Sequence, residues 1–509
     1  MGSSNAGSSA TIGKNTMGIS KVGTMAFVGM TCALVASIRN IPSVAATGWT
    51  MFFYMLVAVL LYGFPISMIA GEYAGMFPQA GGPELWVTHS LGKKWGFVVS
   101  WLLWVQMFPG MVMVASVLAP MLGEVVNNNV LGSNNIFTLV CILAVYWGVT
   151  LLNLKFDMAK IGGKIGIWLG LYIPIAILLI LGLAALGKVG FNPSSTLGTF
   201  SPEKLLPDTT TKMTLEYFAP IIFIFVGIEM SSVYITRIKN PVKTYVKGIF
   251  IALIFMFLFN AVSAFVVANV VPAGKMELNN ISQSIVLFCD ILGLPHIIAN
   301  IFSLLVFLGV AVQLSAWASG PSKTITQSAR RGQYPPKFKF WKTNENDVSK
   351  AVLFTQATII SIFALVYLLI PAVNSAFLTL VSATTLLYCF VYIFMGLGIL
   401  KFRKTHPQQS RPFRIGKKGN GILWGLTVIL FATIVFAIAL TLMEMTIVSI
   451  IAILAISFGL LVVPLIIDKL KKPSWATEVQ KLMDGEQHNI PQKSMADLHK
   501  AAQKTAKTK

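Results

Sequence analysis

Arg39, Glu72, Glu216 and Glu229 lie inside apolar stretches of this sequence, where a charge is unfavourable, and all but Glu216, which lies near the outer start of its helix, are candidates for a function. Arg39 falls in VASIRNIPSVAATGW, Glu229 in APIIFIFVGIEMSSVYITRIKNP, and Glu72 near the end of SMIAGEYAGMF. Ionisable groups at membrane depth face the protein interior or a water-filled cavity, and they mark transport pathways. We therefore expect Arg39 and Glu229 to bind substrate or to act as gates, and Glu72, near water at the inner end of its helix, to be a third gating residue.

A structural role for the first two residues is also open. Arg39 and Glu229 would then form a buried ion pair that locks two helices together. Buried ion pairs are poor stabilisers compared with well-packed apolar residues, so packing alone is a weak reason to keep them. The sequence leaves open whether Arg39 touches a substrate or only Glu229.

Each of the two charged segments also contains a helix breaker. Pro42 removes a backbone donor and disfavours helix at the preceding residue, and Gly227 lowers helix propensity just before Glu229. Amide donors at such a break are a suitable seat for a carboxylate. An ordinary kink is the alternative, because Pro and Gly are common in membrane helices. We predict unwound, substrate-binding backbone at Ser37, Ile38, Arg39 and Asn40 and at Gly227, Ile228, Glu229 and Met230.

The composition indicates that these residues belong to a membrane protein with many spans. The chain has 509 residues, of which 55% are hydrophobic and 11% charged. Its apolar stretches are close to the ~20 residues that cross a hydrocarbon layer. We predict twelve transmembrane helices, over residues 22–47, 50–77, 97–122, 135–154, 160–186, 214–236, 246–273, 296–322, 351–371, 375–400, 421–443 and 446–467.

The basic residues indicate how these helices are oriented. The formal net charge is +21, and with the first helix starting inside, the inner loops include KTITQSARRGQYPPKFKFWK and KFRKTHPQQSRPFRIGKK. The outer loops then hold only Lys188, Lys204, Lys212 and Lys275. The positive-inside rule places both termini in the cytoplasm. Because the charge is divided among short loops without an aromatic stacking platform, we expect membrane lipids rather than nucleic acid as partners.

The two broken spans, the first and the sixth, hold corresponding positions in two five-helix halves. Paired interruptions of this kind indicate an inverted-repeat transporter with its site at the midplane. The segment 78–96, with Gly-Gly-Pro and WVTHSLGKKWG, is expected to form a short cytoplasmic or re-entrant element at the inner gate. We divide the chain into a disordered N-terminal arm over 1–21, a first repeat over 22–186, a second repeat over 214–400, two further helices over 421–467, and a disordered cytoplasmic tail over 468–509.

No signature of an enzyme or of a metal site competes with this interpretation. The sequence has no P-loop, no dinucleotide-binding glycine fingerprint and no HExxH. The four cysteines lack metal-type spacing and are expected to be small core residues. We therefore expect no catalytic residue, no metal and no cofactor. A channel is the alternative of a different class, although a channel usually shows a repeated pore signature.

The sequence resembles the amino acid/polyamine/organocation superfamily, and within it the glutamate/GABA antiporter family with its decarboxylase-linked relatives. The resemblance is carried by SIRNIPSVAATGW, GEYAGMFPQAGGPELWVTHSLGKKWGF, VGIEMSSVYITRIKNPVK and VQLSAWASGPSKTITQSARRGQYPP, and covers roughly residues 20–467. It implies an all-α, five-plus-five inverted-repeat fold with two further helices, in a bacterial plasma membrane. It also implies exchange of an amino acid for the product of a cytoplasmic decarboxylase, which would contribute to acid resistance.

Position by position, the resemblance implies that 37–40 and 227–230 hold substrate and that Trp317 lies where an aromatic residue lines the site. Arg39 departs from the glutamate/GABA proteins, which carry an uncharged or acidic side chain there, and this weakens the case for glutamate. Trp104 and Trp317 are expected to stack on a cationic amine, with packing or lipid contact as the alternative for each.

Several substrate pairs are compatible with this resemblance. They are histidine/histamine, tyrosine/tyramine, ornithine/putrescine, agmatine/putrescine and glutamate/GABA. Because the Glu229 carboxylate would suit a cationic amine or an imidazole, we favour histidine/histamine. A uniporter or proton symporter of cationic amino acids is the alternative.

Overall fold

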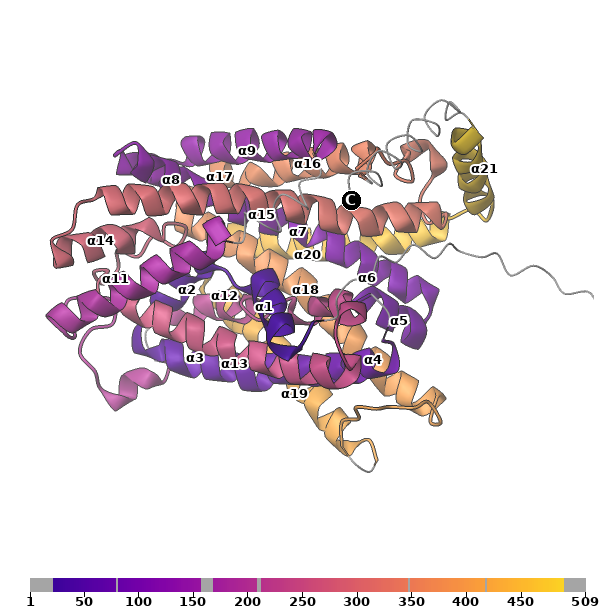
Figure 1. The fold of residues 1–509 in the computed structure, drawn as a ribbon, viewed down its shortest axis with the longest axis horizontal. Helices are drawn as coiled ribbons and strands as arrows, with labels where there is room; N and C mark the ends of the chain where they lie inside the picture. Colours follow the sequence, from indigo (N-terminus) through magenta and orange to yellow (C-terminus); the bar gives the residue numbers. More distant parts are fainter. Residues whose placement is uncertain are drawn as a thin grey trace, which may run out of the picture.

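The computed structural model describes residues 22–78, 81–156, 168–207, 212–346, 348–416 and 419–488. Over these residues the regular structure is helical, apart from two isolated bridges, Val22 with Ile238 and Ser195 with Pro272. The long helices run side by side along one axis of the molecule (Figure 1). This confirms the predicted all-α architecture. The N-terminal arm over 1–21 and the tail beyond residue 488 lie outside the described residues.

Within the described ranges, eleven helices are long and apolar enough to cross a membrane. They are Gly48–Met76 (containing α3, Met51–Val57, and α4, Phe64–Met76), Lys93–Val125 (α6, Lys93–Val105; α7, Met107–Ser116; α8, Leu118–Val125), α9 (Asn135–Lys155), Trp168–Val189 (containing α11, Ile173–Val189), Leu215–Thr236, α13 (Pro241–Ala268), α15 (Ile297–Arg330), Lys350–Leu369 (α16, Lys350–Ala364; α17, Val366–Leu369), α18 (Val373–Thr405), α19 (Gly421–Glu444) and α20 (Ile447–Leu470).

The first predicted span supplies the twelfth crossing, in two pieces. It consists of α1 (Thr24–Val35) and α2 (Ile41–Ala45), each too short to cross a membrane alone. The sixth span is also divided, into α12 (Phe218–Phe223) and a 3-10 segment (Ile228–Arg237). Twelve helices with the first and the sixth broken agree with the prediction. The grouping of these helices into two repeats remains a prediction.

Several spans begin at a polar side chain that caps the first turn. Asn134 accepts the Phe137 backbone N–H at 2.9 Å before α9. Thr446 accepts the N–H of Ser449 at 3.3 Å before α20. The first N–H groups of a helix have no partner within the helix, so a side-chain acceptor at this point fixes where the helix starts.

Two helices continue well beyond their predicted ends. We expected spans at 296–322 and 375–400, whereas α15 reaches Arg330 and α18 reaches Thr405. Hydropathy marks only the apolar part of a helix, and the backbone hydrogen bonds continue past it. Arg403, which we had assigned to a cytoplasmic loop, is therefore helical, and it is buried within the protein.

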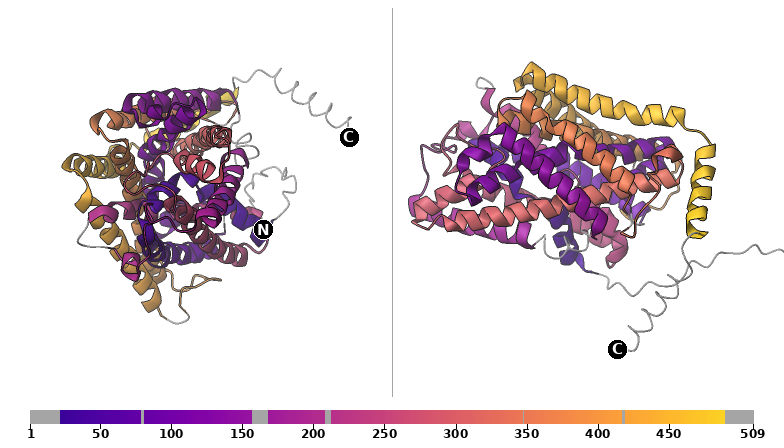
Figure 2. Two further views of the ribbon diagram at one scale, coloured as in Figure 1. Left: turned by 90° about the vertical axis from the view of Figure 1, so that its left-hand side faces the viewer. Right: turned by 90° about the horizontal axis from the view of Figure 1, so that it is seen from above.

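At the predicted inner end of the bundle, two short helices cap the long ones. The first is α5 (Pro83–Leu91), which confirms the short helix expected within 78–96 and packs on α6 and α18. The second is α21 (Ser474–His488), which lies across the end of the bundle (Figure 2) and packs on α15, with Val479 fully buried. The expectation of disorder over 468–509 is therefore wrong for residues 474–488, because this segment has an apolar side chain to bury.

The fifth and eighth spans cross at a pair of glycines. A Cβ atom added at Gly309 of α15 would lie 1.9 Å from the Cα of Gly170. Small residues at such a crossing let two membrane helices approach closely, and packing then replaces the hydrophobic effect as the source of stability.

We predict that Gly309→Ala destabilises the protein by about 1–3 kcal/mol, the usual range for an overpacked interior. The matched control is Gly320→Ala on the same helix, where an added Cβ meets nothing within 4 Å. Both changes improve helix propensity, so only the clash differs. Thermal unfolding of the purified protein in detergent should show a lower midpoint for Gly309→Ala only. Equal midpoints for the two variants would contradict the helix crossing.

Candidate functional site

The first break separates α1 from α2. After Val35 the chain is extended at Ala36 (φ −64°, ψ 136°) and Ser37 (φ −151°, ψ 131°), and a 3-10 turn follows over Ile38–Asn40. Ser37 caps this turn, because its Oγ accepts the Arg39 backbone N–H at 3.2 Å and the Arg39 side-chain Nε–H at 2.8 Å. Pro42 lies in the first turn of α2, where its missing N–H leaves no hydrogen bond unmade.

The second break is made by Gly227. It adopts φ +86°, a left-handed conformation that favours glycine, and it separates the turn after α12 from the 3-10 segment. Glu229 therefore lies in the first turn after the break. Both breaks occur at the residues where the sequence predicted them.

Glu229 is fully buried and is held by two tyrosines of α18. The Tyr388 hydroxyl donates to Oε1 at 2.8 Å, and the Tyr392 hydroxyl donates to Oε2 at 2.7 Å. The Gly227 N–H donates to the same Tyr392 hydroxyl at 2.9 Å, and the Tyr245 hydroxyl donates to the Glu229 carbonyl at 3.1 Å. Neutral donors thus occupy both carboxylate oxygens, and one hydroxyl joins the carboxylate to the break.

Arg39 points to Trp317 and makes no contact with Glu229. The residue is 3% exposed, and its guanidinium carbon lies 5.3 Å from the centroid of the Trp317 ring, in a cation–π arrangement. None of the ion pairs formed within the described ranges includes Arg39. The ion pair between Arg39 and Glu229 that the sequence left open is therefore not formed, and that interpretation is wrong. A π face and hydroxyl groups stabilise the two charges separately.

Of the two tryptophans expected at the site, Trp317 contacts it and Trp104 does not. Trp104 is buried, its indole N–H donates to Gln356 Oε1 at 2.8 Å, and its ring packs edge-on against Trp101 and Phe108. Its one polar group is satisfied and its ring is enclosed by side chains of the scaffold. These are packing contacts, and the assignment of Trp104 to the substrate site stays a prediction.

The remaining predicted site residues lie around the two breaks. Ile38 and Ile228 are buried apolar side chains, and Asn40 is buried beside the first break. Met230 is half-buried and faces Gly82, in the loop that leads to α5. They shape the site, whereas Arg39 and Glu229 supply its charge.

Two contacts join the two predicted repeats at the predicted inner end of the bundle. The Ser232 hydroxyl donates to the Gly81 carbonyl at 2.5 Å, and Arg331 Nη1 lies 3.3 Å from Glu84 Oε1. Gly81 and Glu84 flank the start of α5 in the first repeat, whereas Ser232 and Arg331 belong to the second. Burial raises the pKa of the Glu84 carboxyl above its ordinary value, and the Arg331 charge lowers it by less. We call the contacts of Ser232 with Gly81 and of Arg331 with Glu84 the inner latch. Its ion pair depends on the charge of Glu84.

Glu72 does not reach water as expected. It is fully buried and forms an ion pair with both nitrogens of the Arg403 fork, with Arg403 Nε 2.7 Å from Oε1. The Ile415 N–H donates to Oε2 at 2.9 Å, and Arg411 Nε lies 3.6 Å from Oε1. These contacts anchor the end of α18 and the loop after it to α4. They are the contacts of a structural anchor, and the gating role expected for Glu72 stays a prediction.

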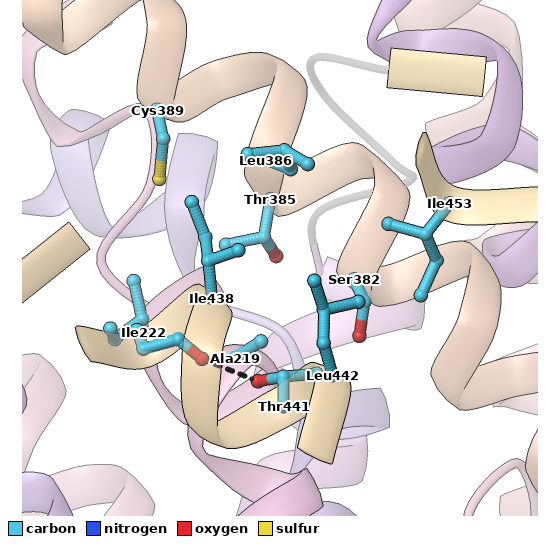
Figure 3. Close-up of a pocket in the computed structure, with 11 residues that line it drawn as sticks. Ala219, Ile222, Ser382, Thr385, Leu386, Cys389, Ile438, Thr441, Leu442 and Ile453 are labelled. Atoms are coloured by element: carbon cyan, nitrogen blue, oxygen red, sulfur yellow. Dashed lines mark hydrogen bonds between the residues drawn. The ribbon is translucent and has the colours of Figure 1, made fainter. Parts of the chain in front are cut away.

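A pocket elsewhere in the bundle is uncharged. It lies between α12, α18, α19 and α20 (Figure 3) and is lined by Ala219, Ile222, Ser382, Thr385, Leu386, Cys389, Ala437, Ile438, Thr441, Leu442 and Ile453. With only apolar and hydroxyl-bearing or thiol side chains, it offers nothing to fix a charged ligand. The breaks, where the charges gather, are the better candidate site.

Sequence reasoning missed the partners of both buried carboxylates. The signal for Tyr388 and Tyr392 is their spacing in LLYCFVYIF, since residues four apart share a helix face. For Arg403 no such signal exists, because KFRKTHPQQS reads as an ordinary inner loop. Within the described ranges, no group of three or more His, Cys, Asp or Glu side chains is placed to hold a metal ion.

The chain is similar in sequence to known transporters. A family model described as amino acid permease matches residues 22–468. An uncharacterized transporter of Legionella pneumophila is 27% identical over 75% of this chain and 81% of its own length. A glutamate/gamma-aminobutyrate antiporter of Lactococcus lactis is 26% identical over 80% of this chain and 81% of its own. A probable agmatine/putrescine antiporter of the same species is 25% identical, over 78% and 82% respectively.

We predict that Tyr392→Phe destabilises the protein by about 1–3 kcal/mol, because it removes a donor from the buried carboxylate and an acceptor from the Gly227 N–H. The control is Tyr334→Phe, which removes a buried hydroxyl that has no hydrogen-bond partner. Thermal unfolding in detergent should show a loss for Tyr392→Phe and little change for Tyr334→Phe. An unchanged midpoint for Tyr392→Phe would argue against its bond to Glu229.

The inner latch should open on acidification. Because burial raises its pKa, Glu84 loses its charge at a higher pH than an exposed glutamate. The ion pair with Arg331 is thus present above that pKa and is lost as the pH falls through it. We expect uptake by reconstituted vesicles to rise on acidification, and Glu84→Gln to remove most of this dependence.

The matched control for this prediction is Glu203→Gln. Glu203 is an exposed glutamate in the segment between α11 and α12, and the change should leave the pH profile as in the wild type. A wild-type profile in Glu84→Gln as well would rule out the latch.

Proposed function

We propose that this chain, which belongs to the amino acid permease family, is an antiporter that exchanges an external amino acid for its internal decarboxylation product. The observation that carries the proposal is the meeting of two broken spans around two buried charges that do not neutralise each other. Broken helices that meet at the midplane are how secondary transporters build a substrate site. The antiporters among the relatives support exchange as the mode of transport.

The geometry supports a specific way of binding. Residues 36–40 leave the helical conformation, and backbone amides at such a break suit the carboxylate of an amino acid. The amine or ring of the ligand would then be held by the Trp317 ring, which lies against Arg39, and near the tyrosines around Glu229. Rocking of one repeat against the other would then expose the site to each side in turn.

Opening toward the cytoplasm requires the inner latch to separate. The Gly81–Ser232 and Glu84–Arg331 contacts both cross between the predicted repeats. The Glu72–Arg403 pair also joins α4 of the first predicted repeat to the end of α18, the last helix of the second, but it is fully buried and joined by further hydrogen bonds, so it is harder to separate than the latch. Exchange rather than net uptake follows if the empty carrier reorients slowly.

Histidine/histamine is the substrate pair that we propose to test first. An imidazole or an ammonium group would suit the Trp317 face and the neighbourhood of Glu229. However, tyrosine hydroxyls occupy both Glu229 oxygens, so this carboxylate does not single out a cationic ligand. Tyrosine/tyramine, ornithine/putrescine, agmatine/putrescine and glutamate/GABA therefore belong in the same panel.

We place the protein in a bacterial plasma membrane with both termini in the cytoplasm, next to a decarboxylase that consumes a proton. Export of the more positively charged product would then remove acid equivalents from the cell and contribute to acid resistance. The basic inner loops support this orientation and a contact with anionic lipids.

We expect uptake of radiolabelled histidine into proteoliposomes to rise several-fold when the vesicles are preloaded with histamine. Parallel vesicles hold tyramine, putrescine, GABA or no amine. Stimulation by a different amine, with its own amino acid as the labelled substrate, would keep the exchange mechanism and replace the pair. Equal uptake into empty vesicles would overturn antiport in favour of a uniporter or a proton symporter of cationic amino acids. An imposed proton gradient separates those two.

A further inference from the structure

Arg39 has hydrogen-bonding capacity that the protein does not use. Its Nε–H donates to Ser37, and its guanidinium carbon lies over the Trp317 ring. Its Nη1 is buried and has no hydrogen-bond partner, although the residue is only 3% exposed. A buried donor without an acceptor is unfavourable, and a charged one more so. The arrangement is therefore incomplete without an acceptor.

Among the described residues, no carboxylate forms an ion pair with Arg39 that would supply this acceptor. The oxygens of Glu229 are held by Tyr388 and Tyr392, and those of Glu72 by Arg403, Arg411 and the Ile415 N–H. Within the described ranges, Arg39 takes part in no ion pair. A ligand can supply the acceptor instead, and the planar guanidinium fork fits a carboxylate with two parallel hydrogen bonds.

We propose that Arg39 is the specificity-determining residue that tells the amino acid from its amine, by recognising the carboxylate that decarboxylation removes. This inference rests on the exchange proposed above. When the amino acid enters, the guanidinium turns from Trp317 to the carboxylate and leaves the ring face open. When the amine enters, no carboxylate is present, and Arg39 stays over Trp317.

Arg39 therefore attracts one ligand and repels the other. For the amino acid, the guanidinium neutralises a negative group close to the first break. For the amine, which is itself a cation, the guanidinium is an uncompensated like charge in a site with few neutralising groups, and this repulsion weakens binding. Removal of the charge should thus move the two affinities in opposite directions, which loss of folding or of general packing would not do.

The test uses equilibrium binding to the purified full-length protein in detergent, which does not depend on exchange. Radiolabelled histidine and histamine are the first probe pair, and ornithine and putrescine are the second. Loss of a charge-assisted hydrogen bond predicts that Arg39→Gln weakens binding of the amino acid roughly tenfold or more. Binding of the amine should stay unchanged or become tighter.

Arg39→Lys is the conservative variant and keeps the charge without the fork, so its amino acid affinity should lie between those of the wild type and Arg39→Gln. It also provides the comparison if Arg39→Gln fails to fold. Ser37→Ala keeps the guanidinium and removes the two bonds that the Ser37 hydroxyl accepts, from the Arg39 backbone N–H and from Nε, so it should keep the preference between the two ligands.

Equal weakening of the amino acid and the amine by Arg39→Gln or Arg39→Lys would overturn the role of Arg39 and point to a structural one. Unchanged amino acid binding in both variants would overturn it as well. Failure of the wild type to bind either member of either pair would instead count against the proposed exchange.

Discussion

An ionised side chain inside a membrane must be compensated by something other than water, and this constraint organises the whole structure. Glu72 and Arg403 meet it with each other, through a two-nitrogen fork and a backbone N–H. Glu229 meets it with the hydroxyls of Tyr388 and Tyr392. Arg39 meets it only in part, with a hydroxyl and a π face.

The buried ionisable groups differ in how completely other groups of the protein pair with them, and this difference distinguishes structural residues from candidate site residues. A carboxylate whose oxygens are shared with an arginine and a backbone amide joins α4 to α18 and leaves nothing for a ligand. A carboxyl group held by two neutral hydroxyls has no opposite charge paired with it, and it is tied to the Gly227 break through Tyr392. A guanidinium with a free nitrogen retains capacity for an anion. The incompletely compensated charges lie at the breaks, where substrate is expected.

The inner end of the bundle shows the same distinction between fixed and separable contacts. The bond from the buried Ser232 hydroxyl to Gly81 and the partly exposed ion pair of Arg331 with Glu84 each join one predicted repeat to the other through a single contact. Ion pairs of this kind contribute little stability and break easily. A transporter needs contacts between its moving parts that are weak enough to open, and the deeply buried Glu72 network meets this need less well than the latch.

The membrane class, the helix count and the two breaks could be predicted from the amino-acid sequence. These follow from hydropathy over about 20 residues and from the backbone chemistry of Pro42 and Gly227, which are local properties. The sequence also singled out Arg39, Glu229 and Trp317 by residue type. Only the tertiary structure decided what each charge contacts. It removed the Arg39–Glu229 pair, enclosed Trp104 in the scaffold, and brought Tyr388, Tyr392 and Arg403 to partners more than 150 residues away. Contacts between helices that are distant in the sequence depend on how the whole bundle packs, and no single segment of the sequence determines that packing.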